Sequence, residues 1–375
     1  MKFLIIDTYY PAFLQSFWAR NPGIKSHSYA EQWRTLMDEC FGTADYYSTN
    51  LKKLGHEATE LVANCPILQL TWAQEHSLRL HHKIRYRKMA GLQVPWIERD
   101  WYYPVLLEQV KAHSPDVIHF QDPGSTDPSF LREIRPFVRL ITAQIACPFP
   151  AGTDFTQYDL MLSSFPHFVD QFKRQGLQSE YFNLAFEPRI LMHVQKTQEH
   201  DVVFVGGVSP AHADRMQFLE KIASRVKIDW WGYGVEYLAH DSALRRSHRE
   251  PVWALEMYDK LHNARIALNH HIDVSKNCAN NMRLFEATGV ATCLVTDHKD
   301  NLETLFQPGK EVLAYRSVEE CVEMIAHYLA HEEERKAIAE AGQARTLKEH
   351  TYFQRMKQFA SLAEYYLRRQ SERTS

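Results

Sequence analysis

The feature that most constrains this fold is a pattern of short apolar runs that alternate with helix-length segments, and the pattern occurs twice. In the first half the run Lys2–Asp7 (KFLIID) opens the series, and in the second half Asp201–Val205 (DVVFV) opens it again. Such runs are typical of strands buried on both faces of a parallel sheet, and their alternation with helices indicates βαβ units. The sequence therefore predicts two α/β domains. Two domains also suit a chain of 375 residues, because single cores rarely grow beyond ~250–300 residues.

The first half predicts an N-terminal domain. Its predicted strands are Lys2–Asp7, Glu57–Asn64, Asp116–Gln121, Val138–Ala146, Tyr158–Ser163 and Ser179–Leu184. Its predicted helices are Ala30–Leu54, Leu68–Met89 and Trp101–His113. The segment Phe186–Glu199 shows neither the hydrophobic period of a helix nor that of a strand, and it contains Pro188. We therefore place the domain boundary within it. The N-terminal domain then spans residues 1–187.

The second half repeats the pattern. Its predicted strands are Asp201–Val205, Val226–Trp231, Ala264–Asn269 and Ala291–Thr296. Its predicted helices are Asp214–Ser224, Val252–Asn263, Asn281–Thr288 and Val318–Ala330. Ser317 and Glu320 form a capping box at the start of the last helix, with the Glu320 side chain reaching the Ser317 backbone N–H. The charged tail Glu332–Arg373 is predicted to be helical with a break at Thr351. This gives a C-terminal domain at 188–350 and a terminal helix at 351–375.

Charge and composition exclude several classes of protein. Lys and Arg total 43 against 46 Asp and Glu, which argues against nucleic-acid binding by bulk charge. No run of roughly 18 apolar residues occurs, and the stretch after Lys2 is too short for a signal peptide, so we expect a cytoplasmic protein without a membrane span. The six scattered cysteines favour reduced thiols. The basic run His81–Lys88 suggests a solvated face or peripheral contact with an anionic membrane surface.

Glycine is scarce, with 14 in the chain, so its two clusters need a backbone reason. Gly206-Gly207 and Gly232-Tyr233-Gly234 each follow a predicted strand, where ligands of parallel sheets bind. Without Cβ atoms, Gly206-Gly207 would let backbone N–H groups approach an anion, and Arg215 would add a charge-assisted bond to a diphosphate. The alternative is a plain tight turn with a surface arginine. Neither the G-x-G-x-x-G fingerprint nor a P-loop motif is present, which argues against a dehydrogenase and a P-loop nucleotidase.

The densest polar cluster follows the predicted strand Ala264–Asn269. Its candidate ligand-binding residues are His270, Asn280, Asn281, Arg283 and Glu286. If Asn281–Thr288 is a helix, Arg283 and Glu286 lie three residues apart on one face, and the two asparagines lie at its start. A carboxylate there accepts two hydrogen bonds from vicinal hydroxyls, as a ribose presents them. The alternative is a capped helix with a local Arg–Glu ion pair.

In the first half, His119 lies near the carboxyl end of its predicted strand, as do Asp7, Gln121, Asp122 and Gln144. A histidine or carboxylate with a near-neutral pKa suits a general base that acts on an acceptor hydroxyl. The alternative for His119 is a core histidine satisfied by a neighbour.

Twenty histidines raise the question of a metal. The sequence has no H-E-x-x-H and no D-x-D motif. The adjacent pairs His81-His82 and His270-His271 cannot share one ion in the way that residues four apart on a helix would. We therefore expect neither a metal nor a cofactor.

The stretch NHHIDVSKNCANNMRLFEATGVATCLVTDHKDNLETLFQPGKEVLAYRSVEEC resembles the C-terminal domain of bacterial GT-B glycosyltransferases, most of all the spore-maturation-protein-like group. The similarity runs from about Asp201 to Thr351, with FVGG, WGYG, NNMRLFEATG and DHKDNLETLF as landmarks. It implies two Rossmann-like domains with parallel sheets facing across a cleft, and a terminal helix that crosses back to the first domain. It also implies metal-independent transfer of a sugar from a nucleoside-diphosphate sugar to a hydroxyl acceptor. The acceptor would be a glycan, a lipid-linked group or a protein, in bacterial polysaccharide or glycoconjugate synthesis.

The resemblance also implies roles for residues. Glu286 matches the glutamate that binds the donor ribose, Gly206 and Gly207 match the glycine turn near the diphosphate, and Arg283 matches a phosphate or sugar contact. The predicted donor-binding set is Gly206, Gly207, Arg215, Gly232, Tyr233, Gly234, His270, Asn280, Asn281, Arg283 and Glu286. The predicted catalytic residues are His119 and Arg283.

One position departs from the family pattern. Many retaining relatives carry a second glutamate eight positions before the ribose-binding one, and this chain has Cys278 there. Retention and inversion of configuration both stay open as a result, and so does the need for a base. Two alternative functions follow: a catalytically silent nucleotide-binding module of the same fold, and a sugar-nucleotide epimerase.

Overall fold

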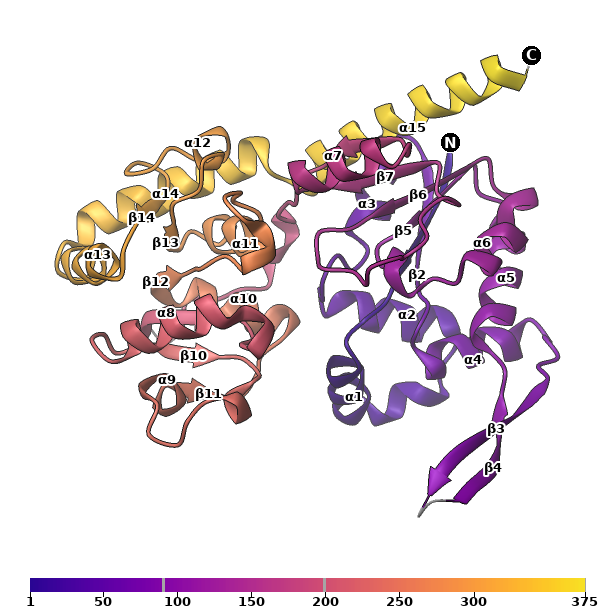
Figure 1. Cartoon of the computed structure of the whole chain (residues 1–375), viewed down its shortest axis with the longest axis horizontal. Helices are drawn as coiled ribbons and strands as arrows, with labels where there is room; N and C mark the ends of the chain where they lie inside the picture. Colours follow the sequence, from indigo (N-terminus) through magenta and orange to yellow (C-terminus); the bar gives the residue numbers. More distant parts are fainter. Residues whose placement is uncertain (90–91, 198–199, 375) are drawn as a thin grey trace. The chain divides into compact units, whose positions relative to one another are not determined.

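The computed structural model describes residues 1–89, 92–197 and 200–374 (Figure 1). The chain forms two compact units, Met1–Glu180 with Lys357–Ser375 and Tyr181–Met356. We call them the N-terminal unit and the C-terminal unit. Each is built around a six-stranded sheet flanked by helices, so the predicted α/β fold class is confirmed. Residues 198–199 of the predicted boundary segment and Ser375 of the predicted terminal helix lie outside the described residues.

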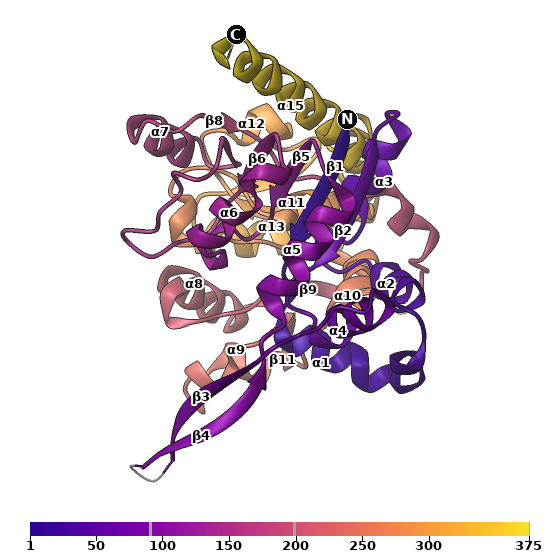
Figure 2. The same ribbon diagram turned by 90° about the vertical axis from the view of Figure 1, so that its right-hand side faces the viewer.

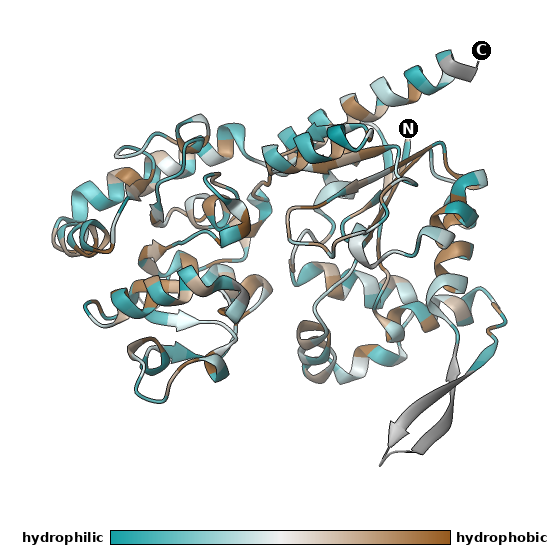
Figure 3. Ribbon diagram, viewed as in Figure 1, coloured by the Kyte–Doolittle hydropathy of each residue, from teal (hydrophilic) through white to brown (hydrophobic). Residues whose placement is uncertain are grey.

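The sheet of the N-terminal unit has the strand order β2-β1-β5-β6-β7-β8. Its strands are β1 (Lys2–Asp7), β2 (Glu57–Val62), β5 (Val117–Phe120), β6 (Leu140–Gln144), β7 (Leu160–Ser163) and β8 (Ser179–Tyr181). The helices are α1 (Pro11–Arg20), α2 (Tyr29–Asp38), α3 (Tyr46–Lys53), α4 (Pro66–Glu75), α5 (Tyr102–His113), α6 (Pro128–Ile134) and α7 (Pro166–Arg174). All six predicted strands are present. In Figure 3 the strands carry the hydrophobic colour, as expected where both faces of a sheet are covered.

Two helix predictions in this unit were wrong. The predicted helix Ala30–Leu54 is two helices, α2 and α3, because Cys40, Gly42 and Ala44 between them all adopt positive φ angles that a helix cannot contain.

The predicted helix Leu68–Met89 instead ends early, with α4, and Ser77 just beyond it has φ +53°. The chain then forms an antiparallel ribbon of β3 (His82–Met89) and β4 (Leu92–Arg99), which pair only with each other among the described strands (Figure 2). In the sequence, apolar and basic residues alternate from Ile84 to Arg87, a period of two that is typical of a strand.

The sheet of the C-terminal unit has the order β11-β10-β9-β12-β13-β14, with every neighbouring pair parallel. Its strands are β9 (His200–Val205), β10 (Asp229–Trp231), β11 (His248–Arg249), β12 (Ala264–Leu268), β13 (Cys293–Asp297) and β14 (Leu313–Tyr315). The helices are α8 (Ala213–Ala223), α9 (Ala243–Arg246), α10 (Ala254–His262), α11 (Met282–Gly289), α12 (Leu302–Leu305), α13 (Val318–Ala330) and α14 (Glu332–Glu349). If the six strands are numbered 1 to 6 in chain order, their order across the sheet is 3-2-1-4-5-6, the arrangement of dinucleotide-binding Rossmann sheets. The sequence predicted four of the six strands and missed β11 and β14, which span only two and three residues.

A helix cap fixes the start of α13. Ser317 caps α13 as predicted, since its side chain accepts from the Glu320 N–H. The Glu320 carboxylate, however, accepts from the N–H of Arg316 rather than that of Ser317, so the reciprocal half of the predicted capping box is displaced by one residue.

The charged tail breaks where it was predicted to break. Helix α14 ends at Glu349, and α15 (Tyr352–Thr374) begins after Thr351. The break is held by a strand-like pairing, because the Phe186 N–H donates to the His350 carbonyl (2.8 Å) and the Tyr352 N–H donates to the Phe186 carbonyl (3.0 Å). From Lys357 onward α15 belongs to the N-terminal unit.

Two further findings concern the chain as a whole. No helix within the described parts of the chain is both long enough and apolar enough to cross a membrane. Cys147 is exposed, and the other five cysteines are buried and unbridged.

The part of α15 around Phe359 belongs to the N-terminal core. Phe359 is fully buried, and its ring lies 5.6 Å from that of Phe3 and 4.8 Å from that of His119, centroid to centroid. We therefore expect Phe359→Ala to lower the free energy of unfolding of the N-terminal unit by roughly 3–5 kcal/mol, through lost contacts and the cavity left behind. Scanning calorimetry would measure this. As a control, Tyr365→Ala on the same helix removes a half-exposed ring and should change stability by less than about 0.5 kcal/mol; equal losses would contradict the packing described.

Candidate functional site

The candidate site lies at the carboxyl ends of β9 and β12. The chain passes from β9 to β10 and β11 on one side of β9 and then returns to β12 on the other side. Ligands of open parallel sheets bind at such a switch point. The predicted donor-binding residues all belong to this unit, and they come from the loops after β9, β10 and β12 and from the first turns of α8 and α11.

The two glycine clusters pack against each other. The Gly206 N–H donates to the Trp231 carbonyl and the Val208 N–H donates to the Tyr233 carbonyl, each at 3.0 Å. A Cβ on Gly207 would collide with the Tyr233 ring. A Cβ on Gly234, whose φ is +100°, would collide with the Val208 carbonyl oxygen. The backbone reason for the glycines is therefore this close approach of two strand ends, in which the Gly232 carbonyl also accepts a bond from a histidine ring.

Arg215 ties two of the loops together. It is the third residue of α8, and its guanidinium donates to the Gly207 carbonyl (3.2 Å) and to the His270 carbonyl (3.1 Å). Burial lowers the pKa of Arg215 to about 10, against the attraction of Asp297 and other anions, and Arg283 lowers it further by charge repulsion. The group therefore stays cationic at neutral pH and lies within electrostatic reach of a second guanidinium.

Arg283 is that second guanidinium, and it lies in the first turn of α11. It donates to the carbonyl of Val205, the last residue of β9, at 3.1 Å. It also forms an ion pair with Glu286, with Nη1 and Oε2 2.9 Å apart. Both members are largely buried. The capped helix with a local Arg–Glu pair, which was the alternative interpretation, is therefore present, and a role of the pair in ligand binding stays a prediction. The Nε of Arg283 is buried and has no hydrogen-bond partner within the described residues.

Glu286 lies one turn further along α11. Burial raises the pKa of its carboxyl group, while Arg283 and a hydrogen bond from Tyr258 oppose the rise. Tyr258 belongs to α10 and was not a predicted site residue. The carboxylate is thus held between a cation and a hydroxyl group.

The two predicted asparagines behave differently. Asn281 caps α11, accepting from the Leu284 N–H at 3.2 Å, and its amide donates to Asn269 at 2.8 Å. Asn280 is buried, and its Oδ1 accepts no hydrogen bond within the described residues. Asn281 therefore fixes the start of α11, whereas Asn280 keeps a free acceptor.

The adjacent histidines have separate partners. Tyr315 donates to the Asn269 carbonyl (2.8 Å), so its oxygen accepts from the Nδ1–H of His270 (2.9 Å). Burial lowers the pKa of His270 to about 4, so its ring is neutral at pH 7 and its Nε2 is an acceptor.

His271 pairs with Asp297 instead, with Nδ1 and Oδ1 2.7 Å apart. Burial alone would raise the pKa of Asp297, but the bond and charge of His271, with His270 and Lys299, bring it well below its usual range. Tyr315 and Lys299, which contact His270 and Asp297, were not predicted to belong to the site. The position of these residues at strand ends was the available signal.

His119, the predicted base, lies in the core of the N-terminal unit. Thr142 donates to the Ile118 carbonyl, so its oxygen accepts from the His119 Nδ1–H at 2.8 Å. The ring is fully buried beside Tyr47 and Phe359, and burial lowers its pKa to about 3. These are the contacts of the core histidine considered as the alternative. Its role as a base stays a prediction.

Asp7 offers a different carboxylate at the carboxyl end of β1, next to β5 at the switch point of the N-terminal sheet. It accepts from the Thr8 N–H (2.8 Å) and from the Thr43 hydroxyl (3.1 Å). Burial raises the pKa of Asp7 to about 6, and the nearby charge of Asp122 adds to the rise. A carboxylate with this pKa can accept a proton near neutral pH.

Comparison with known proteins places these features in a family context. Residues 215–361, about two fifths of the chain, match the model of the family described as glycosyl transferase-like. This segment begins at Arg215 and includes His270, Arg283 and Glu286. No curated protein sequence matches the chain significantly.

Several solved structures share the fold along nearly the whole chain. HepE from Anabaena, solved in complex with UDP-glucose, is 10% identical with a TM-score of 0.57, covering 97% of this chain and 100% of that one. AviGT4, a glycosyltransferase involved in avilamycin A biosynthesis, is 15% identical with a TM-score of 0.55, covering 97% and 98%. A putative UDP-N-acetylglucosamine 2-epimerase from Listeria monocytogenes is 12% identical with a TM-score of 0.51, covering 98% and 97%. The chain has the GT-B fold. Its C-terminal unit is glycosyl transferase-like in sequence.

The interlocked glycine loops give a stability prediction. Gly234 and Gly309 both adopt positive φ, +100° and +81°, but a Cβ on Gly309 would meet open space. Gly309→Ala should therefore lower the free energy of unfolding by roughly 1–2 kcal/mol, through backbone strain alone. Gly234→Ala should lower the free energy of unfolding by a further ~1–3 kcal/mol, because the added methyl group forces the loops after β9 and β10 apart. Chemical denaturation of the two variants would measure the difference, and equal losses would show that the loops are not locked together.

Proposed function

We propose that this protein is a glycosyltransferase that moves a sugar from a nucleoside-diphosphate sugar to a hydroxyl acceptor without a metal ion. One observation carries the proposal. Two partly buried guanidinium groups and a buried glutamate converge on the switch point of the C-terminal sheet, within the segment that matches the glycosyl transferase-like family. HepE, which has the same fold, was solved with UDP-glucose bound, and this supports a nucleotide sugar as the donor.

The donor diphosphate would be bound by Arg215 and Arg283. The two cations repel each other, and a diphosphate between them would replace that repulsion with two charge-assisted attractions. The unpartnered Nε of Arg283 offers a further donor. As the glycosidic bond forms, negative charge accumulates on the departing diphosphate, and cations already held in place stabilise it with little reorganisation. In this proposal they supply the positive charge that a metal ion supplies elsewhere.

The nucleoside would be bound by Glu286 and the glycine loops. Glu286 would accept hydrogen bonds from the two ribose hydroxyls, and its ion pair would hold Arg283 toward the phosphates at the same time. Tyr233 is half-exposed beside Gly207, and its ring gives the base a surface for stacking. His270, neutral and with a free Nε2 acceptor, would accept a hydrogen bond from a sugar hydroxyl.

On the acceptor side, we propose Asp7 rather than His119 as the proton acceptor if the reaction needs one. The pKa of about 6 for Asp7 suits deprotonation at neutral pH, whereas a histidine with a pKa of about 3 is a weak base. If configuration is retained, the leaving diphosphate can take the proton and no base is needed. Measuring the anomeric configuration of the product by NMR would decide between these two cases.

An epimerase of the same fold is the second candidate function, because the protein from Listeria monocytogenes with this fold is described as a putative UDP-N-acetylglucosamine 2-epimerase. A silent nucleotide-binding module is the third, because Cys278 replaces a carboxylate of many retaining relatives. A thermal-shift screen of nucleoside diphosphates, followed by mass spectrometry with donor and candidate acceptors, separates them. Free nucleoside diphosphate together with a glycosylated acceptor supports the transferase. An isomerised nucleotide sugar supports the epimerase, and binding without turnover supports the silent module.

The diphosphate role gives a sharp prediction for Arg215. Arg215→Gln should raise the dissociation constant for the nucleoside diphosphate about 10- to 100-fold, since hydrogen bonds to charged groups contribute roughly 1.5–3 kcal/mol. Binding of the free nucleoside should not change. Calorimetric titration would measure both. Arg225→Gln is the matched control, because Arg225 lies just beyond the same helix and pairs with the exposed Glu319. Equal loss of nucleoside and diphosphate binding would instead indicate a general disturbance of the loops.

The ribose role gives a prediction for Glu286. Glu286→Gln keeps the shape of the side chain but removes its charge, so binding of the nucleoside should weaken by roughly 1–3 kcal/mol. A titration that compares the ribonucleoside diphosphate with its 2′-deoxy analogue would measure the effect. The wild-type protein should prefer the ribose form, and the variant should lose that preference. An unchanged preference in a folded variant would exclude the assignment.

A further inference from the structure

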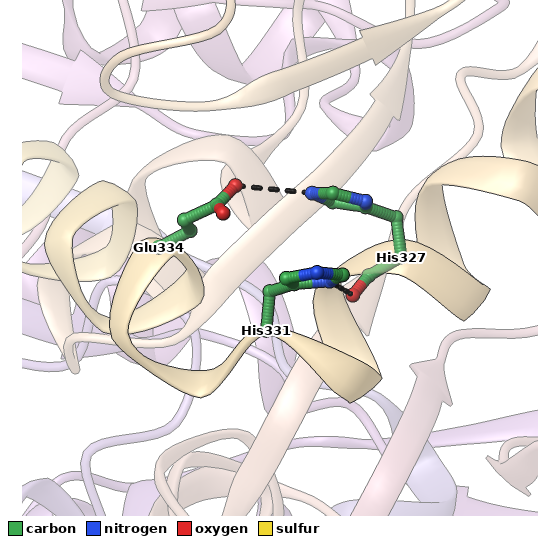
Figure 4. A group of neighbouring side chains, drawn as sticks. All are labelled: His327, His331 and Glu334. Atoms are coloured by element: carbon green, nitrogen blue, oxygen red, sulfur yellow. Dashed lines mark hydrogen bonds and ion pairs between the residues drawn. The ribbon is translucent and has the colours of Figure 1, made fainter.

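A second cluster of chemically active side chains lies away from the candidate site. It consists of His327 in the last turn of α13, His331 between the helices, and Glu334 in the first turn of α14 (Figure 4). Helix α13 follows β14 and runs back along the sheet. The carbonyl of Leu329, near its end, accepts a bond from Arg265 at the start of β12 (2.9 Å). The cluster therefore lies at the amino-terminal edge of the sheet, opposite the edge that carries the candidate site.

The three side chains are already close enough to share an ion. One ligand atom of each lies within 4.8 Å of the other two. The Nε2 of His327 and the Oε2 of Glu334 are 3.0 Å apart, bridged by a proton (Figure 4). Ligands of a tetrahedral zinc ion at ~2.0–2.1 Å lie about 3.3 Å from one another. A zinc ion could therefore take the place of this proton with little change in the distance between the two groups.

The third ligand is held in the correct tautomer. The Nδ1 of His331 donates to the backbone carbonyl of His327 at 2.8 Å, which leaves the lone pair on Nε2. A hydrogen bond from the second ring nitrogen to a carbonyl is the usual support of a metal-binding histidine. His331 lies just beyond α13, but its backbone N–H also donates to the His327 carbonyl (2.9 Å), so the helical spacing of four residues extends to it. This observation is independent of the distances between the ligand atoms.

The surroundings favour a cation. Helix α14 opens with Glu332, Glu333 and Glu334, of which Glu332 forms an ion pair with Lys336. The two imidazole rings stack with their centroids 4.0 Å apart, so they must turn toward a common point when an ion binds. All three residues are exposed, and no core packing opposes that rotation.

We propose that His327, His331 and Glu334 bind one Zn²⁺ ion, with water as the fourth ligand. Imidazole and carboxylate ligands in a small, adjustable arrangement suit zinc. The ion links the end of α13 to the start of α14 and stabilises the folded C-terminal unit by mass action, because it binds the folded form in preference to the unfolded form. The site takes no part in sugar transfer, so the proposed metal-independent reaction is unaffected by it.

The test is a titration of the full-length protein with ZnCl₂, followed by calorimetry and by scanning for the melting temperature. We expect saturable binding of an ion to this site and a rise in melting temperature of the C-terminal unit. His331→Ala should weaken that binding at least about tenfold and remove the rise, since a ligand is lost. His240→Ala is the matched control, because His240 is another exposed histidine of the same unit, and it should behave as the wild type.

Two further measurements make the result decisive. Glu334→Gln tests the site without disturbing the bond between His331 and the His327 carbonyl, and it should also weaken binding. Cobalt(II) should give the visible absorption of a tetrahedral site in the wild type and lose it in both variants. Equal zinc affinity in the wild type, His331→Ala and Glu334→Gln would overturn the proposal, as would binding absent at millimolar zinc. Sugar transfer measured with and without a chelator tests the proposed function separately. If the protein transfers no sugar, its affinity for zinc is still expected to be the same.

Discussion

The candidate site depends on how two guanidinium groups are held at the end of β9. At that point the regular strand ends, and the carbonyl groups of Val205 and Gly207 need donors. Arg283 donates to the carbonyl of Val205, and Arg215 donates to that of Gly207. A buried cation needs acceptors as much as a buried carbonyl needs donors. The arginines therefore satisfy the backbone of the sheet while they keep positive charge at its edge, and one set of contacts both orders the loops and places two cations beside them.

The neighbouring histidines show how backbone contacts set the charge of this edge. His270 and His271 are adjacent in the chain, yet one is bonded to a tyrosine and the other to a carboxylate. Tyr315 is itself committed to a backbone carbonyl, so His270 donates to it and stays neutral. Asp297 is instead surrounded by His271 and Lys299 and remains ionised. Cations, an anion and a neutral acceptor therefore alternate along this edge, which is the arrangement that the proposed nucleotide-sugar donor requires.

Much of this arrangement was predictable, because it depends on local patterns. Short apolar runs placed β1 and β9, and helical spacing brought Arg283 and Glu286 to one face of α11. An asparagine at the predicted start of that helix does cap it. The assignment of a ribose-binding role to Glu286, in contrast, rested on resemblance and stays a prediction.

What the sequence did not reveal depends on contacts between distant segments. The glycines after β9 were explained by the approach of a ligand. In the structure a side chain at these positions would collide with the Tyr233 ring and the loop after β10, and this close approach is defined only by the folded sheet. His119 was chosen for its position at a strand end. Its burial depends on Phe359, which lies 240 residues further along the chain. The ribbon of β3 and β4 was missed for a different reason, since its charged residues were interpreted as one face of a helix when their period was two.

The spacing of His327 and His331 was present in the sequence, but it does not show that Glu334 of the next helix lies beside them. The place of these three residues in the fold explains why they need not disturb the site. Helices that connect parallel strands run opposite to them, so the end of α13 returns to the amino-terminal edge of the sheet. An ion bound at that edge is separated from the carboxyl-terminal edge by the length of the strands. A doubly wound unit can therefore carry an ion that serves only stability on one edge and an anion-binding site on the other, and each can change without changing the other.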